Sequence, residues 1–303
     1  MSKPRRAPRR PVDGVLLLDK PRGLTSNAAL QKVRWLFNAE KAGHTGTLDP
    51  LATGLLPLCF GDATKFAGEL LGADKTYRAE LRLGVTTDTG DAEGQVLKIR
   101  PVEVARDQLL EAMQCFRGEI DQIPPMYSAL KRNGRPLYEY ARAGIELERE
   151  ARRITIYGLD LLDFTDDRVI LDVDCSKGTY IRTLAVDLGE RLGCGAHLTA
   201  LRRTRIGAFK LTEAVALDML EALDLTGRDR CLAPVDSLLC TLPEARLNSV
   251  EFSRVSHGQG IRWNSRAGEA WRLYGPEGTF LGLGRLSDDG WLIPRRLVSA
   301  QGK

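Results

Sequence analysis

The feature that most restricts the fold of this chain is a glycine-rich segment of twelve residues, Gly43 to Gly54, which carries one acid, Asp49. Its glycines, among them Gly46, permit backbone angles that are closed to other residues. Pro50 fixes its own φ and disfavours the helical conformation for Asp49. The segment is therefore predicted to be a stiff turn that presents a single carboxylate.

The same turn also carries His44 and several threonines. A tight turn capped by an aspartate is the ordinary interpretation of a short Gly-Thr-Leu-Asp-Pro sequence. The density of polar groups around Asp49 favours an active-site loop instead.

Length and composition are those of a globular protein with one large domain and one small one: 303 residues, 43% hydrophobic and 28% charged. The formal net charge of +4 and the pI near 8.7 are too mild to establish a nucleic-acid partner by themselves. That inference has to come from local clusters of basic residues.

Cysteine and histidine spacing argues against a metal site. The six cysteines form no Cys-x-x-Cys pair, and three histidines offer no zinc-ligand spacing. We expect reduced, mostly buried thiols, no metal and no cofactor. No secretory signal or membrane span is apparent, so we expect a cytoplasmic protein.

The first twelve residues are predicted to form a flexible basic arm, containing Lys3, Arg5, Arg6, Arg9 and Arg10. Such an arm either follows RNA phosphates or remains solvated, and the sequence leaves both open.

Periodicity predicts alternating strands and helices over the next 230 or so residues. Strands are expected at 15–18, 75–83 and 169–175, and helices after Thr25 or Ser26, at 106–116, from Thr179 to Gly193, and at 211–225. The acidic stretch from Asp88 to Gly94 does not have calcium-loop spacing and is predicted to be a solvated loop. The stretch around Pro234 and Pro243 is the expected linker.

Two further regions suggest contact with RNA. Residues 124–153 combine seven Lys and Arg residues with three tyrosines, a mixture suited to phosphates and bases, although a charged surface helix at 137–144 would explain several of them. The last sixty or so residues alternate apolar runs with glycine turns and predict a small β-rich domain. Trp263, Trp271 and Trp291 are assigned to its core.

Several motifs, taken together, resemble the TruB-type tRNA pseudouridine synthases, which isomerise uridine 55 in the T loop of tRNA. The resemblance covers nearly the whole chain in the expected order, through 14–21, 43–54, 75–77, 123–131, 175–182 and 195–203. It implies an α/β (α+β) fold in which a mixed, largely antiparallel sheet with flanking helices forms the catalytic domain (13–242). It also implies an RNA-gripping insertion at about 124–153 and a small PUA-like β-barrel domain (243–303).

The resemblance also assigns roles to individual residues. Asp49 would be the nucleophile, attacking C1′ of the sugar or C6 of the base or promoting a glycal, and Arg182 would hold it ionised. Tyr77 would stack on the flipped base and handle a proton, while the remaining substrate-binding residues would be His44, Tyr180, Leu201 and, in a supporting role, Lys20.

Other functions fit less well. Serine-hydrolase chemistry through His197 and Ser176 lacks a Gly-x-Ser-x-Gly elbow, and a glycosidase would need a second carboxylate beside Asp49, whereas Asp62 is assigned to a surface turn. A non-catalytic tRNA-binding or tRNA-folding module remains the alternative. Because guide-RNA-dependent relatives carry lysine-rich tails absent here, we expect a monomer that recognises the tRNA T stem-loop without guide RNA, protein partner or membrane.

Overall fold

A computed structural model describes residues 8–265 and 268–299. Within these residues, the larger domain is built on a ten-stranded mixed sheet. Eight of its strands follow the order β14-β1-β3-β12-β4-β11-β10-β7; in addition, β13 pairs with β12 and β2 pairs with β3. Most neighbours are antiparallel, and β1 with β14 and β12 with β3 are parallel. The predicted fold class is confirmed.

The strands of this sheet are β1 (Gly14–Lys20), β2 (Ala42–His44), β3 (Thr53–Phe60), β4 (Lys75–Leu83), β7 (Gly118–Gln122), β10 (Arg152–Thr165), β11 (Arg168–Cys175), β12 (Ala196–Ile206), β13 (Phe209–Lys210) and β14 (Val215–Ala216). Two small hairpins lie outside it, β5 (Val85–Thr87) with β6 (Val96–Ile99) and β8 (Lys131–Arg132) with β9 (Arg135–Pro136).

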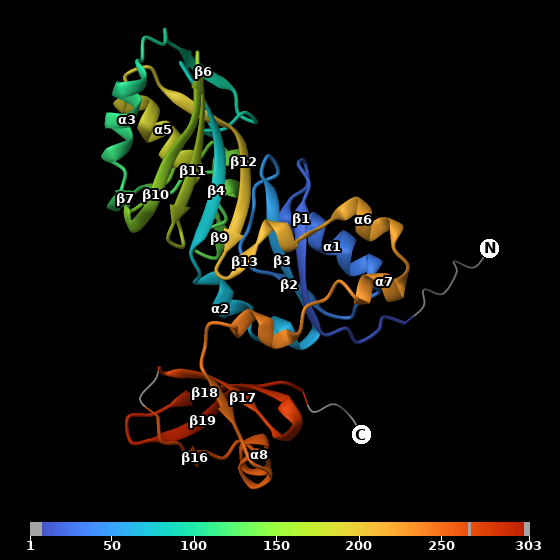
Figure 1. Cartoon of the computed structure of the whole chain (residues 1–303). Helices are drawn as coiled ribbons and strands as arrows, with labels where there is room; N and C mark the ends of the chain where they lie inside the picture. The colour runs from blue at the N-terminus through green and yellow to red at the C-terminus, as the bar shows by residue number, and fades with distance from the viewer. Residues whose placement is uncertain (1–7, 266–267, 300–303) are drawn as a thin grey trace, which may run out of the picture.

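The helices of this domain are α1 (Ser26–Leu36), α2 (Ala67–Leu71), α3 (Arg106–Gln114), α4 (Leu137–Arg142), α5 (Ile181–Arg191), α6 (Leu217–Ala222) and α7 (Leu225–Asp229), with 3-10 turns η1 (Gly61–Lys65), η2 (Leu211–Glu213) and η3 (Val235–Leu239). In Figure 1, α3 and α5 lie near the end of the sheet formed by β7 and β10, and α1, α6 and α7 gather near β1.

Residue alternation explains why β4 is a strand with one buried face. Tyr77, Ala79, Leu81 and Leu83 are all at most 7% exposed, and the residues between them are more exposed. By contrast, β3 lies between β1 and β12 and is buried along almost its whole length. A strand covered on both faces reads as a continuous apolar run, which is the sequence of Leu55 to Phe60.

Two predictions about the chain need correction. The expected helix at 211–225 is divided into η2, β14 and α6, and α7 begins at Leu225, because Val215 pairs in parallel with Leu18 and Ala216 with Asp19 of β1. Arg10, which was predicted to lie in the flexible basic arm, is instead packed against the larger domain. Arg10 pairs with Asp229 and donates from Nε to the Phe37 carbonyl (2.9 Å), whereas Lys3, Arg5 and Arg6 lie outside the described residues.

The C-terminal domain is a curled five-stranded sheet with one longer helix, as the glycine-rich pattern predicted. Its elements are β15 (Glu244–Arg246), α8 (Ser249–Ser256), β16 (Ile261–Arg262), β17 (Ala270–Tyr274), η4 (Pro276–Gly278), β18 (Phe280–Leu286) and β19 (Trp291–Leu297), in sheet order β15-β17-β18-β19-β16. Trp271 is buried in its core, and Trp263 is half-buried against it. Trp291 is also half-buried, beneath Arg262.

The expected linker is packed rather than loose. Leu238 and Leu239 of η3 are buried in a cluster that also contains Phe66 and, from the C-terminal domain, Leu283. The Phe66 and Phe280 rings meet edge to face, with centroids 5.6 Å apart. Figure 1 shows the C-terminal domain below the larger one, joined beside α2.

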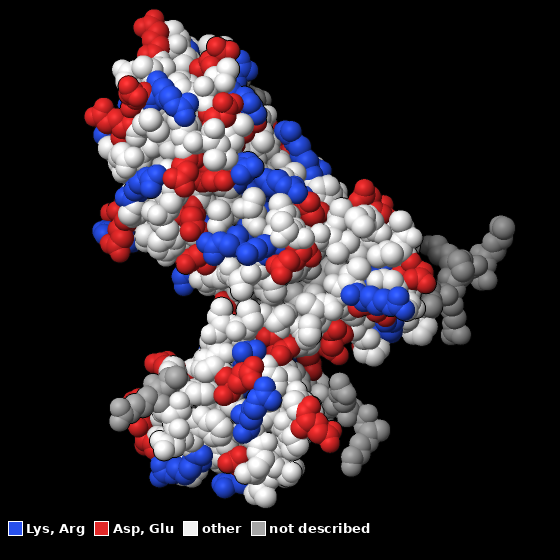
Figure 2. Space-filling model, in the orientation of Figure 1, with Lys and Arg blue, Asp and Glu red and all other residues white. Residues whose placement is uncertain are grey.

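Surface charges of both signs intermingle on the face of the molecule shown in Figure 2. On the sheet, arginines pair with acids of other strands: Arg78 with Asp172 (2.9 Å) and Arg168 with Glu80 (3.0 Å) between the adjacent β4 and β11, and Arg205 of β12 with Asp174 of β11 (2.6 Å) across β4. These pairs neutralise much of the basic charge of β4, β11 and β12. Across the described part of the chain, no helix is both long and apolar enough to cross a membrane.

Candidate active site

The glycine-rich segment forms the connection between β2 and β3, and two of its glycines adopt backbone angles that favour glycine. Gly54 has φ +99°, and a Cβ there would come within 2.4 Å of the Arg203 carbonyl oxygen on β12. Gly46 has φ +82° and lies against the Arg203 guanidinium. A side chain at Gly54 would clash with the β12 backbone, whereas at Gly46 the positive φ is what would strain any other residue.

The loop is fixed on both sides of Asp49 by the residues that precede and begin α1. The buried Ser26 hydroxyl accepts a hydrogen bond from the Leu48 amide (2.8 Å) and donates to the Leu48 carbonyl (3.0 Å). The Gly23 amide donates to the Pro50 carbonyl (2.8 Å). Asp49 is therefore held between two anchored neighbours.

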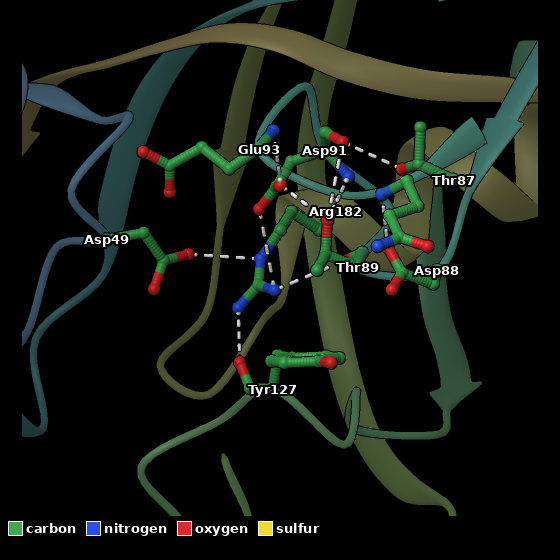
Figure 3. A network of polar contacts seen from close by, with 9 residues as sticks. Asp49, Thr87, Asp88, Thr89, Asp91, Glu93, Tyr127 and Arg182 are labelled. Atoms are coloured by element: carbon green, nitrogen blue, oxygen red, sulfur yellow. Dashed lines mark hydrogen bonds and ion pairs between the residues drawn. The ribbon is translucent and has the colours of Figure 1, made fainter. Parts of the chain in front are cut away.

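Arg182 of α5 links Asp49 to the segment that carries Tyr127 (Figure 3). Its Nε lies 3.0 Å from an Asp49 carboxylate oxygen, and its Nη2 donates to the Tyr127 carbonyl (2.6 Å). The Arg182 side chain is only 6% exposed, whereas that of Asp49 is 39% exposed. The predicted ion pair therefore forms. Its carboxylate is partly accessible to solvent, and its guanidinium is buried and held by the Tyr127 carbonyl.

A third charged residue, Asp91, completes this network. Its carboxylate lies 3.6 Å from Arg182 Nη1, is 5% exposed, and accepts hydrogen bonds from the Thr89 hydroxyl (2.6 Å) and the Glu93 amide (3.0 Å). The prediction of a solvated loop at 88–94 is wrong here, because the β5–β6 hairpin folds back to pair Asp91 with Leu198 of β12.

The electrostatics of Asp49 are set by opposing influences. Burial raises the pKa of its carboxyl above the ordinary value, and the Asp91 charge adds to this, whereas Arg182 and Lys20 lower it. The guanidinium thus favours the ionised form in a site that is partly withdrawn from water.

Lys20 is fully buried at the end of β1. Its Nζ donates to the carbonyls of Pro21 (2.9 Å) and Leu24 (2.6 Å). Burial lowers its pKa to about 8, while the charge of Asp49 acts to raise it. Lys20 therefore lies near the predicted site and supports the turn that leads into α1.

Tyr77 and Tyr180 lie within reach of the Asp49 charge, and Leu201 lies beside Thr53, at the end of the Asp49 loop. Tyr77 on β4 and Leu201 on β12 are 7% and 8% exposed, and Tyr180 is half-buried at the start of α5. Burial raises the pKa of both tyrosine hydroxyls, and the Asp49 charge adds to this increase in each case. Residues that are far apart in the sequence therefore share one site.

His44 lies at the end of β2 with one ring nitrogen buried. Burial, with a contribution from the Arg203 charge, lowers the pKa of His44, and its Nδ1 has no hydrogen-bond partner among the described residues. The second histidine considered above, His197, is buried and faces the Val85 carbonyl (2.9 Å). Its ring is therefore occupied in the β5 region, away from a catalytic triad.

Four residues of this region were missed by sequence reasoning: Ser26, Asp91, Gln122 and Arg203. Gln122 is 2% exposed, and its side-chain amide both accepts from the Tyr180 amide (2.8 Å) and donates to the Tyr180 carbonyl (3.0 Å). No local pattern marks such residues, because each acts on a partner at least 20 positions away. Among the described residues, no group of three or more His, Cys, Asp or Glu side chains could hold a metal ion.

Comparison with known proteins identifies the family. The family model "TruB family pseudouridylate synthase (N terminal domain)" matches residues 34–181, and two C-terminal models of the same family match 182–240 and 243–298. The curated "tRNA pseudouridine synthase B" of Aromatoleum aromaticum is 59% identical over 98% of this chain and 96% of its own. That of Chromobacterium violaceum is 56% identical over 99% of both chains.

This chain belongs to the TruB family of pseudouridine synthases.

Members of this family are isomerases. Among solved structures, the chain is similar to one in the "Crystal Structure of a Cbf5-Nop10-Gar1 Complex", with a TM-score of 0.73, 26% identity and coverage of 95% of this chain and 85% of that one. The family assignment rests on the family models and the curated relatives, and this structural similarity shows a shared fold.

Proposed function

We propose that this protein converts uridine 55 in the T loop of tRNA to pseudouridine, with Asp49 as the catalytic carboxylate. The observation that carries the proposal is the Asp49–Arg182 ion pair (3.0 Å), with its half-exposed carboxylate, in a chain of the TruB family. The curated relatives named as tRNA pseudouridine synthase B support tRNA as the substrate.

The reaction requires the base to leave the RNA stack, detach from the sugar, turn and reattach. The C1′–N1 bond breaks, a C1′–C5 bond forms, the C5 proton leaves, and N1 acquires a proton, so no oxidant, reductant or cofactor is consumed. Flipping the base costs stacking energy, which a closely fitting pocket offsets. Tyr77, Tyr180 and the apolar wall at Leu201 are the residues that we assign to this pocket.

Asp49 must be ionised to act on C1′, on C6, or on the C2′ proton that leads to a glycal. Arg182 favours that form and fixes its orientation, since its own guanidinium is held by the Tyr127 and Thr89 carbonyls (2.6 and 3.2 Å). To take up the C5 proton, Tyr77 must act as a phenolate, a form that burial disfavours by raising its pKa and that the Arg203 guanidinium favours. Removal of water from the pocket strengthens each of these interactions.

We propose the following organisation for RNA binding. The catalytic domain (13–242) acts on the T stem-loop, the insertion at about 124–153 grips it, and the PUA-like domain (243–303) holds the rest of the tRNA. In the insertion, Arg135 and Arg142 stack over Tyr140 and Tyr138 at 4.8 and 5.4 Å, which orders side chains for phosphate and base contacts. We expect a cytoplasmic monomer that requires neither guide RNA nor a protein partner.

The test is pseudouridine mapping at single-nucleotide resolution on an unmodified T-stem-loop RNA. Wild type should modify only the T-loop uridine, and Asp49→Asn should abolish modification while leaving RNA affinity within a few-fold. Asp107→Asn, an exposed carboxylate on α3, is the control and should retain full activity. Turnover by Asp49→Asn would refute the role of Asp49; tight RNA binding without modification by wild type would favour a non-catalytic tRNA-folding protein.

A further inference from the structure

Arg203 is a fully buried arginine for which the sequence provides no explanation. A buried charge is costly unless it is paired and hydrogen-bonded. Among residues 8–265 and 268–299, no carboxylate forms an ion pair with Arg203; its partners are two neutral carbonyl oxygens and the Tyr77 hydroxyl. This contrasts with the adjacent Arg202, which is half-exposed and pairs with Asp19 (2.6 Å).

The carbonyls that Arg203 contacts belong to the Asp49 loop and to the start of β3, which follows it. Nε donates to the Leu55 carbonyl (2.7 Å), and Nη2 donates to the Gly46 carbonyl (3.1 Å). These acceptors lie on opposite sides of Asp49 along the chain. One guanidinium therefore joins the two ends of the loop, and the Arg203 main chain occupies the space that a side chain at Gly54 would need.

Strand pairing places the same residue beside Tyr77. On β12, Arg203 is opposite Gly54 of β3 on one side and opposite Tyr77 of β4 on the other. Side chains directly opposite each other in a sheet point to the same face. Accordingly, the Arg203 guanidinium acts on the Tyr77 hydroxyl through its charge and a side-chain hydrogen bond, and opposes the rise in its pKa that burial causes.

The charge of Arg203 also acts on three other basic side chains nearby. It contributes to the lowered pKa of His44, Lys20 and Lys75, for each of which burial is the larger cause. The positive charge of Arg203 therefore helps to lower the pKa of basic groups on β1, β2 and β4. Arg203 lies beneath the loop, close to all three of these strands.

We propose that Arg203 is a positioning residue that fixes the Asp49 loop against Tyr77, so that the carboxylate and the phenol hold their relative geometry during the reaction. This inference rests on the proposed function. It requires that Arg203 affect the rate of the chemical step and leave RNA binding almost unchanged, because its fully buried side chain faces the protein interior.

The experiment compares Arg203→Met and Arg203→Lys with wild type in single-turnover reactions at saturating enzyme on the T-stem-loop RNA. Under these conditions the rate constant does not depend on the fraction of enzyme that is folded. We expect Arg203→Met to react about 100-fold more slowly, the scale of loss caused by a displacement of about 1 Å in an active site. The RNA Kd should stay within three-fold. Arg203→Lys should fall between Met and wild type, since it keeps the charge but not the two-pronged contact.

Arg168→Met, which removes an exposed arginine paired with Glu80 on the same sheet, is the control and should react at the wild-type rate. The inference is overturned if Arg203→Met reacts within three-fold of wild type, or if its loss appears entirely as weaker RNA binding. Should Arg203→Met fail to fold, Arg203→Lys decides alone, and a wild-type rate for it overturns the inference. An inactive wild type would instead contradict the proposed function.

Discussion

Replacing Asp91 with asparagine tests the network behind Asp49 most directly, because it removes one charge and keeps the shape of the side chain. The amide oxygen of the asparagine could still accept from the Thr89 hydroxyl and the Glu93 amide, which now bond to the Asp91 carboxylate at 2.6 and 3.0 Å. What disappears is the ion pair with Arg182, which spans 3.6 Å between side chains that are 5% and 6% exposed.

The expected loss of stability in Asp91→Asn depends on the contacts that Arg182 keeps. Removing one partner of a buried ion pair usually costs about 3–5 kcal/mol. Arg182 keeps Asp49 and the two carbonyl acceptors, so we expect the free energy of unfolding to fall by about 2–3 kcal/mol. If about half of this free energy serves to orient Asp49 for the reaction, its loss slows the reaction by about 10-fold.

The effect on pH dependence has a defined sign. The Asp91 charge contributes to the raised pKa of Asp49, so its removal lowers that pKa. Activity that requires ionised Asp49 is lost as pH falls through this pKa. The acid limb of the rate profile should therefore move to lower pH in Asp91→Asn, even as the plateau rate decreases.

The assay combines urea unfolding with single-turnover rates between about pH 4.5 and 8, conditions set by the ordinary range of carboxyl pKa values. Asp88→Asn, an exposed carboxylate of the same loop that accepts from the Gln95 amide (2.7 Å), is the matched control and should change stability by less than about 1 kcal/mol. An unchanged plateau rate, or an acid limb that moves to higher pH, would refute this account of Asp91.

Three further predictions concern other parts of the molecule. Because the pKa of Lys20 is lowered from 10.5 to about 8, the unfolded chain binds its proton more tightly; wild type should therefore gain stability relative to Lys20→Met as pH rises from about 8 to 10.5, measured by urea unfolding at both limits. Leu239 is 1% exposed between the domains, and Leu239→Ala should lower stability by about 2–4 kcal/mol, against under about 0.5 kcal/mol for Leu225→Ala, which is 41% exposed; equal effects would show that the η3 contact is dispensable. Affinity for the T-stem-loop RNA should fall steeply between about 50 and 200 mM salt, roughly in proportion to the phosphates contacted; binding that is indifferent to salt would contradict RNA contact through basic side chains.

The sequence predicted the elements whose signals are local. The turn around Asp49 follows from its glycines and Pro50, the strand at 75–83 from alternation, and the helix after Thr25 from its cap, whose hydroxyl accepts from the Ala28 amide (3.0 Å). Glycine-separated apolar runs likewise predicted the C-terminal β domain. In each case the physical cause lies within a few residues of its effect.

Local signals failed where a distant partner decides the structure. The segment at 211–225 has a helical composition, but β1 draws Val215 and Ala216 into the sheet as its last strand. The cysteines were expected to be mostly buried; Cys59, Cys175 and Cys194 are, whereas Cys115 and Cys240 are exposed. Exposure depends on which face of an element meets the core, and for these residues the composition did not reveal it.

For the site itself, the sequence by itself determined the family, the rigid turn and the presence of its one carboxylate, since these depend on residue type and order. Only the tertiary structure decided which groups surround that carboxylate. Asp91 is buried against Arg182, Gln122 holds the Tyr180 backbone, and Arg203 joins the two ends of the loop. Each contact joins residues 58 to 157 positions apart, and it exists because strand pairing and the packing of α5 bring them together. No periodicity along the chain encodes that proximity.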